Sequence, residues 1–160
     1  MSDTPEVHRI AVRELVHAAH RAGDIHTRFL TRSSAIDGIR GHQRVQASRT
    51  GTYEKEVQVF GKQERDGVRL LVRGRVDGVI TESDGVTVEE IKTTRVAPEE
   101  IPESFRSMHW AQAAVYGHLL VESLQVTAVT LRLTYLDLRD DSEFDTRGSP
   151  LRRGSEIILH

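Results

Sequence analysis

Apolar residues recur at helical spacing in two stretches near the start of the chain. The first covers residues 6–22 and stops at Gly23-Asp24; its apolar positions are Ile10, Val12, Leu15, Val16 and Ala19. The second covers residues 33–49, with Ser33 or Ser34 in the position of an N-cap. Spacing of three and four residues between apolar positions is typical of an amphipathic helix. The pattern predicts two helices at the N-terminus.

Alternation of apolar and polar residues replaces the helical spacing in the middle of the chain. Three strand-like segments, Tyr53–Phe60, Val68–Ile80 and Val86–Lys92, are separated by Asp66-Gly67 and Asp84-Gly85. Asp-Gly pairs between alternating segments are strong hairpin signals. We therefore expect an antiparallel meander.

After this meander, helical spacing returns over Phe105–Leu124, and β-branched alternation returns over Val126–Leu138. The predicted order is ααβββαβ. The fold class is α/β, with a central mixed β-sheet flanked by helices and the meander in its middle. Residues 139–160 are charged and turn-rich, and Ile157–Leu159 can add a short edge strand.

Composition favours one globular domain spanning residues 1–160, with a core over about 9–138. No apolar run approaches the roughly 20 residues that span a bilayer, and no signal-peptide pattern opens the chain, so we expect a cytoplasmic protein without a membrane partner. The net charge of −2 is unevenly spread: residues 1–50 hold eight arginines and five acidic residues, a balance of +3 that leaves −5 for the remainder. A basic N-terminal part suits contact with phosphates.

The chain contains no cysteine. Disulfides, thiolate nucleophiles, cysteine zinc sites and an iron–sulfur cluster are therefore excluded for these residues. Any metal must be held by carboxylates, histidines, carbonyls and water. Such hard oxygen ligands favour Mg²⁺ or Mn²⁺.

Two short motifs on neighbouring predicted strands carry the chemistry: Gly74-Arg75-Val76-Asp77, and Glu90-Ile91-Lys92 thirteen residues after Asp77. Because side chains alternate along a strand, Glu90 and Lys92 project from one face while Ile91 points to the other. A hairpin can place Asp77 beside Glu90, and two adjacent carboxylates favour a bound divalent cation. The alternative from the residues alone is a surface salt bridge between Glu90 and Lys92.

These motifs belong to a longer pattern. The chain resembles the RecB-like branch of the PD-(D/E)xK nucleases, with a restriction-endonuclease-like core. That branch carries Gly-x-x-x-His, Gly-x-x-Asp, Asp/Glu-x-Lys and Gln-x-x-x-Tyr in this order. Here they are Gly38–His42, Gly74–Asp77, Glu90–Lys92 and Gln112–Tyr116.

The resemblance implies roles for particular residues. Asp77, Glu90, the Ile91 carbonyl and His42 would bind Mg²⁺ or Mn²⁺, while Lys92 would orient or help deprotonate the attacking water. A second set would support the catalytic face or contact DNA: Gln112, Tyr116, His109, Arg40 and Arg44. From the residues alone, His42 can equally be a satisfied polar side chain, and the helix of Tyr116 can simply pack that ring against the sheet.

The strings Ala35–Arg49, Val86–Arg95 and His109–Tyr116 are closer still to the nuclease-like N-terminal domain of some bacterial DinG/XPD-like helicases. The resemblance implies a DNA exonuclease in repair, acting on single-stranded ends, with a helicase in cis or in trans. No Gly-x-x-x-x-Gly-Lys-Ser/Thr loop occurs, so no helicase motor is expected in this chain. A competing hypothesis is a nuclease-fold module that binds DNA or docks a helicase without cutting.

Overall fold

The structure is a computed structural model that describes residues 6–20 and 35–155. Its elements are β1 (Glu6–Ala11), α1 (Val12–His20), α2 (Ala35–Ser48), β2 (Tyr53–Arg65), β3 (Val68–Glu82), β4 (Gly85–Thr94), a 3₁₀ turn (Pro98–Glu100), α3 (Glu103–Leu124), β5 (Ala128–Asp137), β6 (Glu143–Arg147) and β7 (Leu151–Arg152). The predicted helix caps at Ser33 or Ser34, the stop at Gly23-Asp24 and the strand over Ile157–Leu159 lie outside the described residues.

The first predicted helix is wrong over its first six residues. Glu6–Ala11 forms β1, which pairs in parallel with β3 from Glu6 opposite Val68 to Ala11 opposite Arg73. The helix begins only at Val12, where the side chain is fully buried. Six residues are too few for periodicity to separate helix from strand, and an open sheet edge on β3 decides in favour of the strand.

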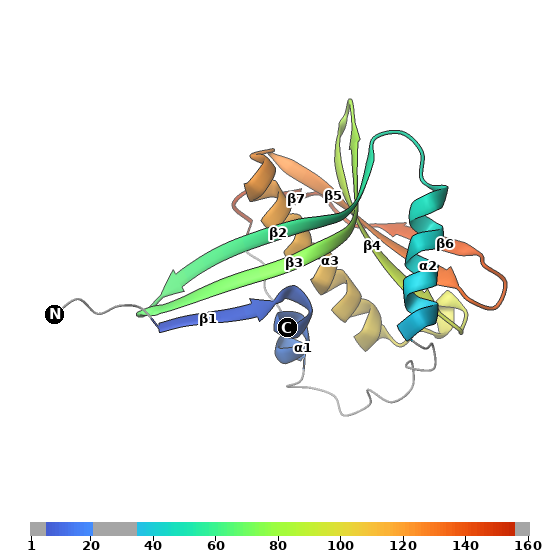
Figure 1. Cartoon of the computed structure of the whole chain (residues 1–160), viewed down its shortest axis with the longest axis horizontal. Coiled ribbons are helices and arrows are strands. Elements are labelled where there is room, and N and C mark those ends of the chain that lie inside the picture. The colour runs from blue at the N-terminus through green and yellow to red at the C-terminus, as the bar shows by residue number, and fades with distance from the viewer. Residues whose placement is uncertain (1–5, 21–34, 156–160) are drawn as a thin grey trace.

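The predicted meander is present. β2 pairs antiparallel with β3 along nearly its whole length, and β3 pairs antiparallel with β4 through the tight turn before Gly85. β2 and β3 are longer than the alternation predicts, and they extend together away from the body of the molecule (Figure 1). We call β1 together with residues 58–75 the arm.

A crossover through α3 joins β4 to β5, which lies parallel to it, as expected when a helix links two strands. β6 and β7 then pair antiparallel with β5 in the turn-rich tail, at residues where the sequence predicted no strand. The sheet is therefore mixed, with path order β1-β3-β4-β5-β6.

Helices cover both faces of this sheet, as predicted for the α/β class. α1 and α3 bury one face in the largest core cluster, which includes Val12, Val76 and Leu120. α2 covers the other face through a small cluster of Val45, Ile91 and Leu136. Within the described residues no helix is long and apolar enough to cross a membrane.

Candidate active site

The edge of β3 that faces β4 changes partner in its middle. β1 occupies this edge at residues 68–73 and β4 occupies it at residues 78–82, because β2 pairs along the opposite edge. Residues 74–77 lie between the two partners. The Gly74-x-x-Asp77 motif therefore stands at a fork, where β3 and β4 separate.

Strand geometry is irregular at this fork. Glu56 has φ +58°, and its pairing with Asp77 is missing although the pairs on both sides keep one register. Val76 and Val79 are three residues apart, yet both side chains lie in the same core cluster. The regular alternation of side chains between the two faces of β3 is therefore interrupted between them. Asp77 also bridges the fork, because its Oδ2 accepts a hydrogen bond of 2.7 Å from the Ile91 amide.

α2 brings His42 to the carboxylate of Asp77. The distance from His42 Nδ1 to Asp77 Oδ1 is 3.3 Å. The helix lies close to the sheet because Gly41 has no side chain: a Cβ there would overlap the side chain of Thr93 and crowd Leu136. At Gly38 a Cβ would meet nothing within 4 Å. The glycine required for packing is thus Gly41, whereas the motif emphasises Gly38.

Glu90 and Lys92 form a buried ion pair beside the fork. Lys92 Nζ lies 2.7 Å from Glu90 Oε1 and 3.0 Å from Gln112 Oε1, and only 2% of the Glu90 side chain is exposed. The second carboxylate oxygen of Glu90 is buried and has no hydrogen-bond partner among the described residues. Burial raises the pKa of Glu90, and the charge of Asp77 adds to the rise, while Lys92 opposes it. The pair is therefore not the surface salt bridge of the alternative reading.

α3 supports this pair from the core side of the sheet. Gln112 and Tyr116 are both buried, and a Cβ on Gly74 would lie 2.5 Å from the Tyr116 ring. The Gly-x-x-Asp glycine lets the ring pack directly on β3. In this structure both residues lie away from solvent, Gln112 against Lys92 and Tyr116 against β3.

His109, one turn before Gln112, shares a hydrogen bond of 2.8 Å with the Tyr135 hydroxyl. Burial lowers the pKa of His109 to about 3, and the charge of Lys92 acts in the same direction. His109 is therefore neutral at physiological pH.

Arg40 and Arg44 lie on the exposed side of α2. They line an open groove of about 460 Å³ together with Arg95 and Asp141. Arg44 contacts Asp141 at 2.8 Å, and Arg95 contacts Asp37 at 2.9 Å. The structure thus keeps both predicted arginines near His42 along the helix but outside the buried pair of Glu90 and Lys92.

Two residues outside the recognised motifs connect α2 to the fork. The Gln46 side-chain amide donates to Glu56 Oε1 and to the Asp77 carbonyl, each at 2.9 Å, and Gln46 is buried. Gln46 lies one helical turn after His42, so i,i+4 spacing was the available signal. The sequence placed its partner Glu56 on a half-solvated strand from which the side chain could reach the metal face.

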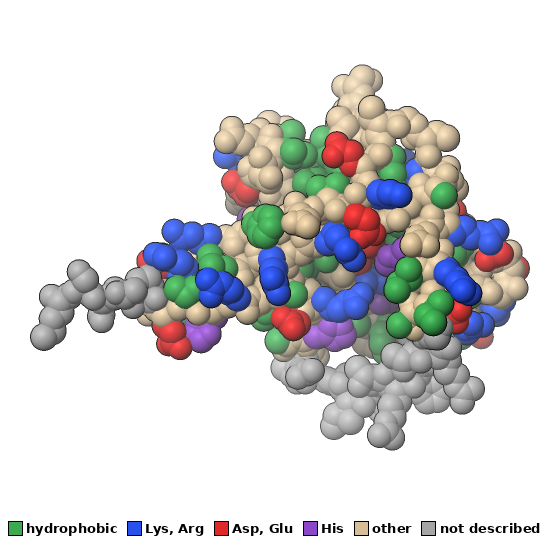
Figure 2. Space-filling view, in the orientation of Figure 1, with side chains coloured by type: hydrophobic (Ala, Val, Ile, Leu, Met, Phe, Trp, Pro, Cys, Tyr) green, Lys and Arg blue, Asp and Glu red, His purple; other side chains and the backbone are tan. Residues whose placement is uncertain are grey.

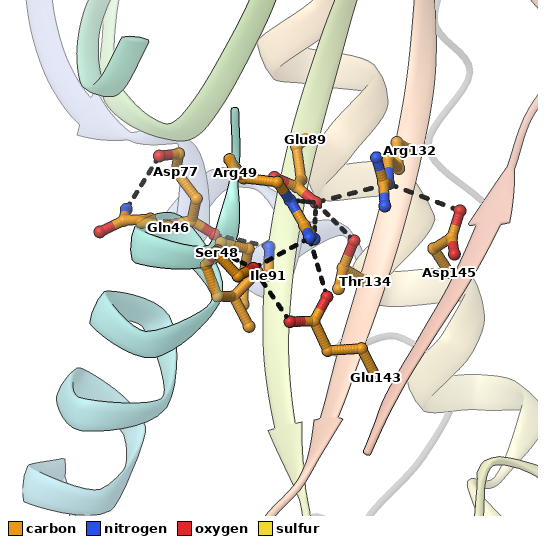
Figure 3. A network of polar contacts seen from close by, with 11 residues as sticks. Gln46, Ser48, Arg49, Asp77, Glu89, Ile91, Arg132, Thr134, Glu143 and Asp145 are labelled. Atoms are coloured by element: carbon orange, nitrogen blue, oxygen red, sulfur yellow. Dashed lines mark hydrogen bonds and ion pairs between the residues drawn. The ribbon is translucent and has the colours of Figure 1, made fainter. Parts of the chain in front are cut away.

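A second polar network lies on the α2 face of β4 (Figure 3). Glu89, fully buried, accepts from Arg49 at 2.6 Å and from Thr134 at 2.7 Å. Arg49 also contacts Glu143 of β6 at 2.8 Å. Burial acts to raise the pKa of Glu89, but hydrogen bonds from Arg49 and Thr134 hold it below its ordinary value. No sequence pattern indicates this pair, because its partners are forty residues apart.

The donor set fits a hard divalent cation. It consists of two carboxylates and an imidazole, and the unpartnered oxygen of Glu90 is a buried acceptor of the kind that a cation satisfies. Over residues 6–20 and 35–155, however, no three histidine or acidic side chains are grouped tightly enough to form a ready metal cluster. Instead, Asp77 contacts His42 and Glu90 contacts Lys92.

Comparison with known proteins agrees with this architecture. The family model described as the PD-(D/E)XK nuclease superfamily matches residues 5–153. A solved structure titled "Crystal structure of SSO0001" has TM-score 0.59 and 20% identity, covering 92% of this chain and 69% of that one, which shows a shared fold. A search of curated proteins finds no match. Since the family model covers nearly the whole chain, with a mixed sheet flanked by helices, the chain belongs to the PD-(D/E)XK nuclease superfamily.

Proposed function

We propose that the protein is a Mg²⁺- or Mn²⁺-dependent deoxyribonuclease that hydrolyses phosphodiesters at the fork between β3 and β4. The observation that carries the proposal is the buried arrangement of Glu90, Lys92 and Gln112 beside Asp77 in a chain of a nuclease superfamily. A mostly buried lysine held by a carboxylate and an amide is already oriented for the reaction, so little reorganisation is needed when charge develops.

In this proposal Asp77, Glu90, His42 and the Ile91 carbonyl would hold the metal. When bound, it supplies Lewis-acid polarisation of the phosphoryl group and a water of lowered pKa. Lys92 would orient the attacking water and stabilise charge that develops on the phosphate. The Gln112 amide oxygen, 3.0 Å from Lys92 Nζ, is a second acceptor that holds the ammonium in position.

Substrate preference follows from the family resemblance. We propose exonuclease action on single-stranded DNA ends in DNA repair, with products that carry a 5′-phosphate and a 3′-hydroxyl. The same resemblance supports our proposal that the chain belongs to the RecB-like branch, near the nuclease-like domain of DinG/XPD-like helicases, with a helicase as its partner.

One observation favours a second candidate function. The acidic groups of the site are paired with His42 and Lys92, and the described residues hold no ready metal cluster. Such pairing is compatible with a nuclease-fold module that binds DNA or docks a helicase without cutting, because that module needs no free side chains to bind a metal.

The deciding experiment is cleavage of end-labelled single- and double-stranded DNA by the purified protein with Mg²⁺, Mn²⁺ or EDTA. Lys92→Ala is compared with Lys55→Ala, an exposed lysine of β2, as the matched control. Metal-dependent cutting that is lost in Lys92→Ala alone supports the nuclease. Binding of DNA without cutting in either metal overturns it in favour of the second candidate.

A further inference from the structure

One face of the arm is left uncovered by the helices. Cross-strand pairs identify its members, because directly opposed residues point to the same side of a sheet. The pairs on this face are Gln58–Arg75, Phe60–Arg73 and Lys62–Leu71 between β2 and β3, with Arg9 of β1 opposite Leu71.

The opposite face of the arm is the one that α1 and α3 cover. A Cβ on Gly61 would overlap Leu119 of α3, and a Cβ on Gly74 would lie 2.8 Å from Val12 of α1. Phe60 points the other way and is 68% exposed, the highest exposure among the large hydrophobic residues described. In the space-filling view, lysine and arginine side chains are spread along the arm (Figure 2).

Charge on the uncovered face is predominantly positive. Glu64 of its β2 row is contacted by Arg69 at 2.9 Å, and Glu56, just before the arm on the same strand, is contacted by Arg75 at 2.5 Å. Three further cations, Arg9, Lys62 and Arg73, are exposed and have no ion-pair partner in the described part of the chain. A solvent-facing row of unneutralised cations around an aromatic ring complements a polyanion that carries planar bases.

This face leads directly into the candidate active site. Arg75 contacts Glu56, Glu56 accepts from Gln46, and Gln46 donates to the carbonyl of Asp77. Arg73 precedes Asp77 by four residues, which corresponds to about 13 Å along a strand. A DNA strand bound at the fork can therefore continue along the arm without leaving the surface.

We infer that the uncovered face of the arm binds a single-stranded segment of the DNA that the fork cleaves, with Arg9, Lys62 and Arg73 at phosphates and Phe60 stacked on a base. The inference rests on the proposed function for the identity of its ligand. A single strand fits better than a duplex, because only unpaired bases offer their faces to an exposed ring.

The test is the dissociation constant for a fluorescent single-stranded oligonucleotide, measured by anisotropy in EDTA so that no cutting occurs. Phe60→Ala and Arg73→Ala are compared with Phe144→Ala and Arg147→Ala on β6, which remove the same groups from another part of the surface. All four side chains are exposed, so loss of the fold does not explain a change. A circular-dichroism melt of each variant checks this directly.

Phe60→Ala should weaken binding about fivefold or more, as expected for loss of one base stack. Arg73→Ala should also weaken binding and lower the slope of log affinity against log salt by about 0.7. Both β6 controls should bind like the original protein. Unchanged affinity in Phe60→Ala and Arg73→Ala overturns the inference, and so does tighter, arm-dependent binding of blunt duplex than of single strand.

Cleavage assays on the same proteins separate this inference from the proposed function. If Lys92→Ala abolishes cutting while the arm variants bind normally, the nuclease stands and the arm inference fails. If no protein cuts but the arm variants lose affinity, the arm binds DNA and the nuclease proposal fails.

Discussion

The Gln46 side-chain amide donates a hydrogen bond of 2.9 Å to the backbone carbonyl of Asp77. This contact ties α2 to β3 at the point where the β2–β3 ladder lacks the Glu56–Asp77 pair. A helix side chain thus supplies a donor where the strand pairing is interrupted. The position of Asp77 therefore depends on α2 as well as on its own strand.

Replacing Gln46 should destabilise the protein more than replacing a neighbour on the same helix. Gln46→Ala leaves the Asp77 carbonyl without this donor in a partly buried setting, which costs about 1–3 kcal/mol. Gln43→Ala, on the exposed side of α2, should change the free energy of unfolding by less than about 0.5 kcal/mol. Urea denaturation of both variants measures the difference, and equal effects would show that the contact contributes nothing.

Breaking the buried pair of Arg49 and Glu89 should be the most damaging of these substitutions. Arg49→Ala removes the closest cation from the buried Glu89 carboxylate, with Thr134, Arg132 and Tyr53 still near it, and loss of one partner of a buried pair costs about 3–5 kcal/mol. Arg44→Ala removes an exposed pair with Asp141 and should cost less than about 1 kcal/mol. Thermal unfolding followed by circular dichroism compares the two; a loss in Arg49→Ala no larger than in Arg44→Ala contradicts the prediction.

The two glycines of α2 should respond to alanine with opposite signs. Gly38→Ala meets no neighbour within 4 Å and should stabilise the helix by about 0.5–1 kcal/mol. Gly41→Ala places a methyl group against Thr93 and should destabilise by about 1–3 kcal/mol through overpacking. Equilibrium unfolding of both variants gives the signs, and stabilisation by both would mean that α2 does not pack closely on β4.

The loss of folding stability at acid pH should be smaller when His109 is replaced. Burial lowers the pKa of His109 to about 3, so below pH 6.5 the unfolded chain takes up a proton that the folded protein does not. This residue contributes no pH dependence above that range, and it destabilises the fold progressively as pH falls from about 6.5 towards about 3. Between pH 7 and 5 the loss attributable to His109 is about 2 kcal/mol.

His109→Gln should flatten the stability profile over this interval. Its absolute stability also changes, because the hydrogen bond to the Tyr135 hydroxyl is altered, so the slope with pH is the informative quantity. Urea midpoints at pH 7, 6 and 5 measure it, with His8→Gln on β1 as the control for an exposed histidine. Parallel profiles for His109→Gln and the original protein would show that His109 titrates normally in the folded state.

The sequence alone was sufficient to predict those elements whose structure depends on residues close together in the chain. The turns at Asp66-Gly67 and Asp84-Gly85 define the meander, and alternation between them places Asp77, Glu90 and Lys92 on adjacent strands. The helical spacing of 105–124 likewise predicts α3 to within two residues. These features depend on neighbours in the chain, whose geometry follows from turn chemistry and from the periods of helix and strand.

Only the tertiary structure decided the features that depend on residues far apart in the chain. β1 is a strand because β3 offers it an edge, and β6 and β7 are strands because β5 does the same for a polar tail. Gly41 matters more than Gly38 because of what α2 packs against. The fork at Asp77 exists because two separate strands share one edge of β3. Periodicity reports which face of an element is apolar, but hydrogen-bond partners and close contacts across the fold are set by how the elements assemble.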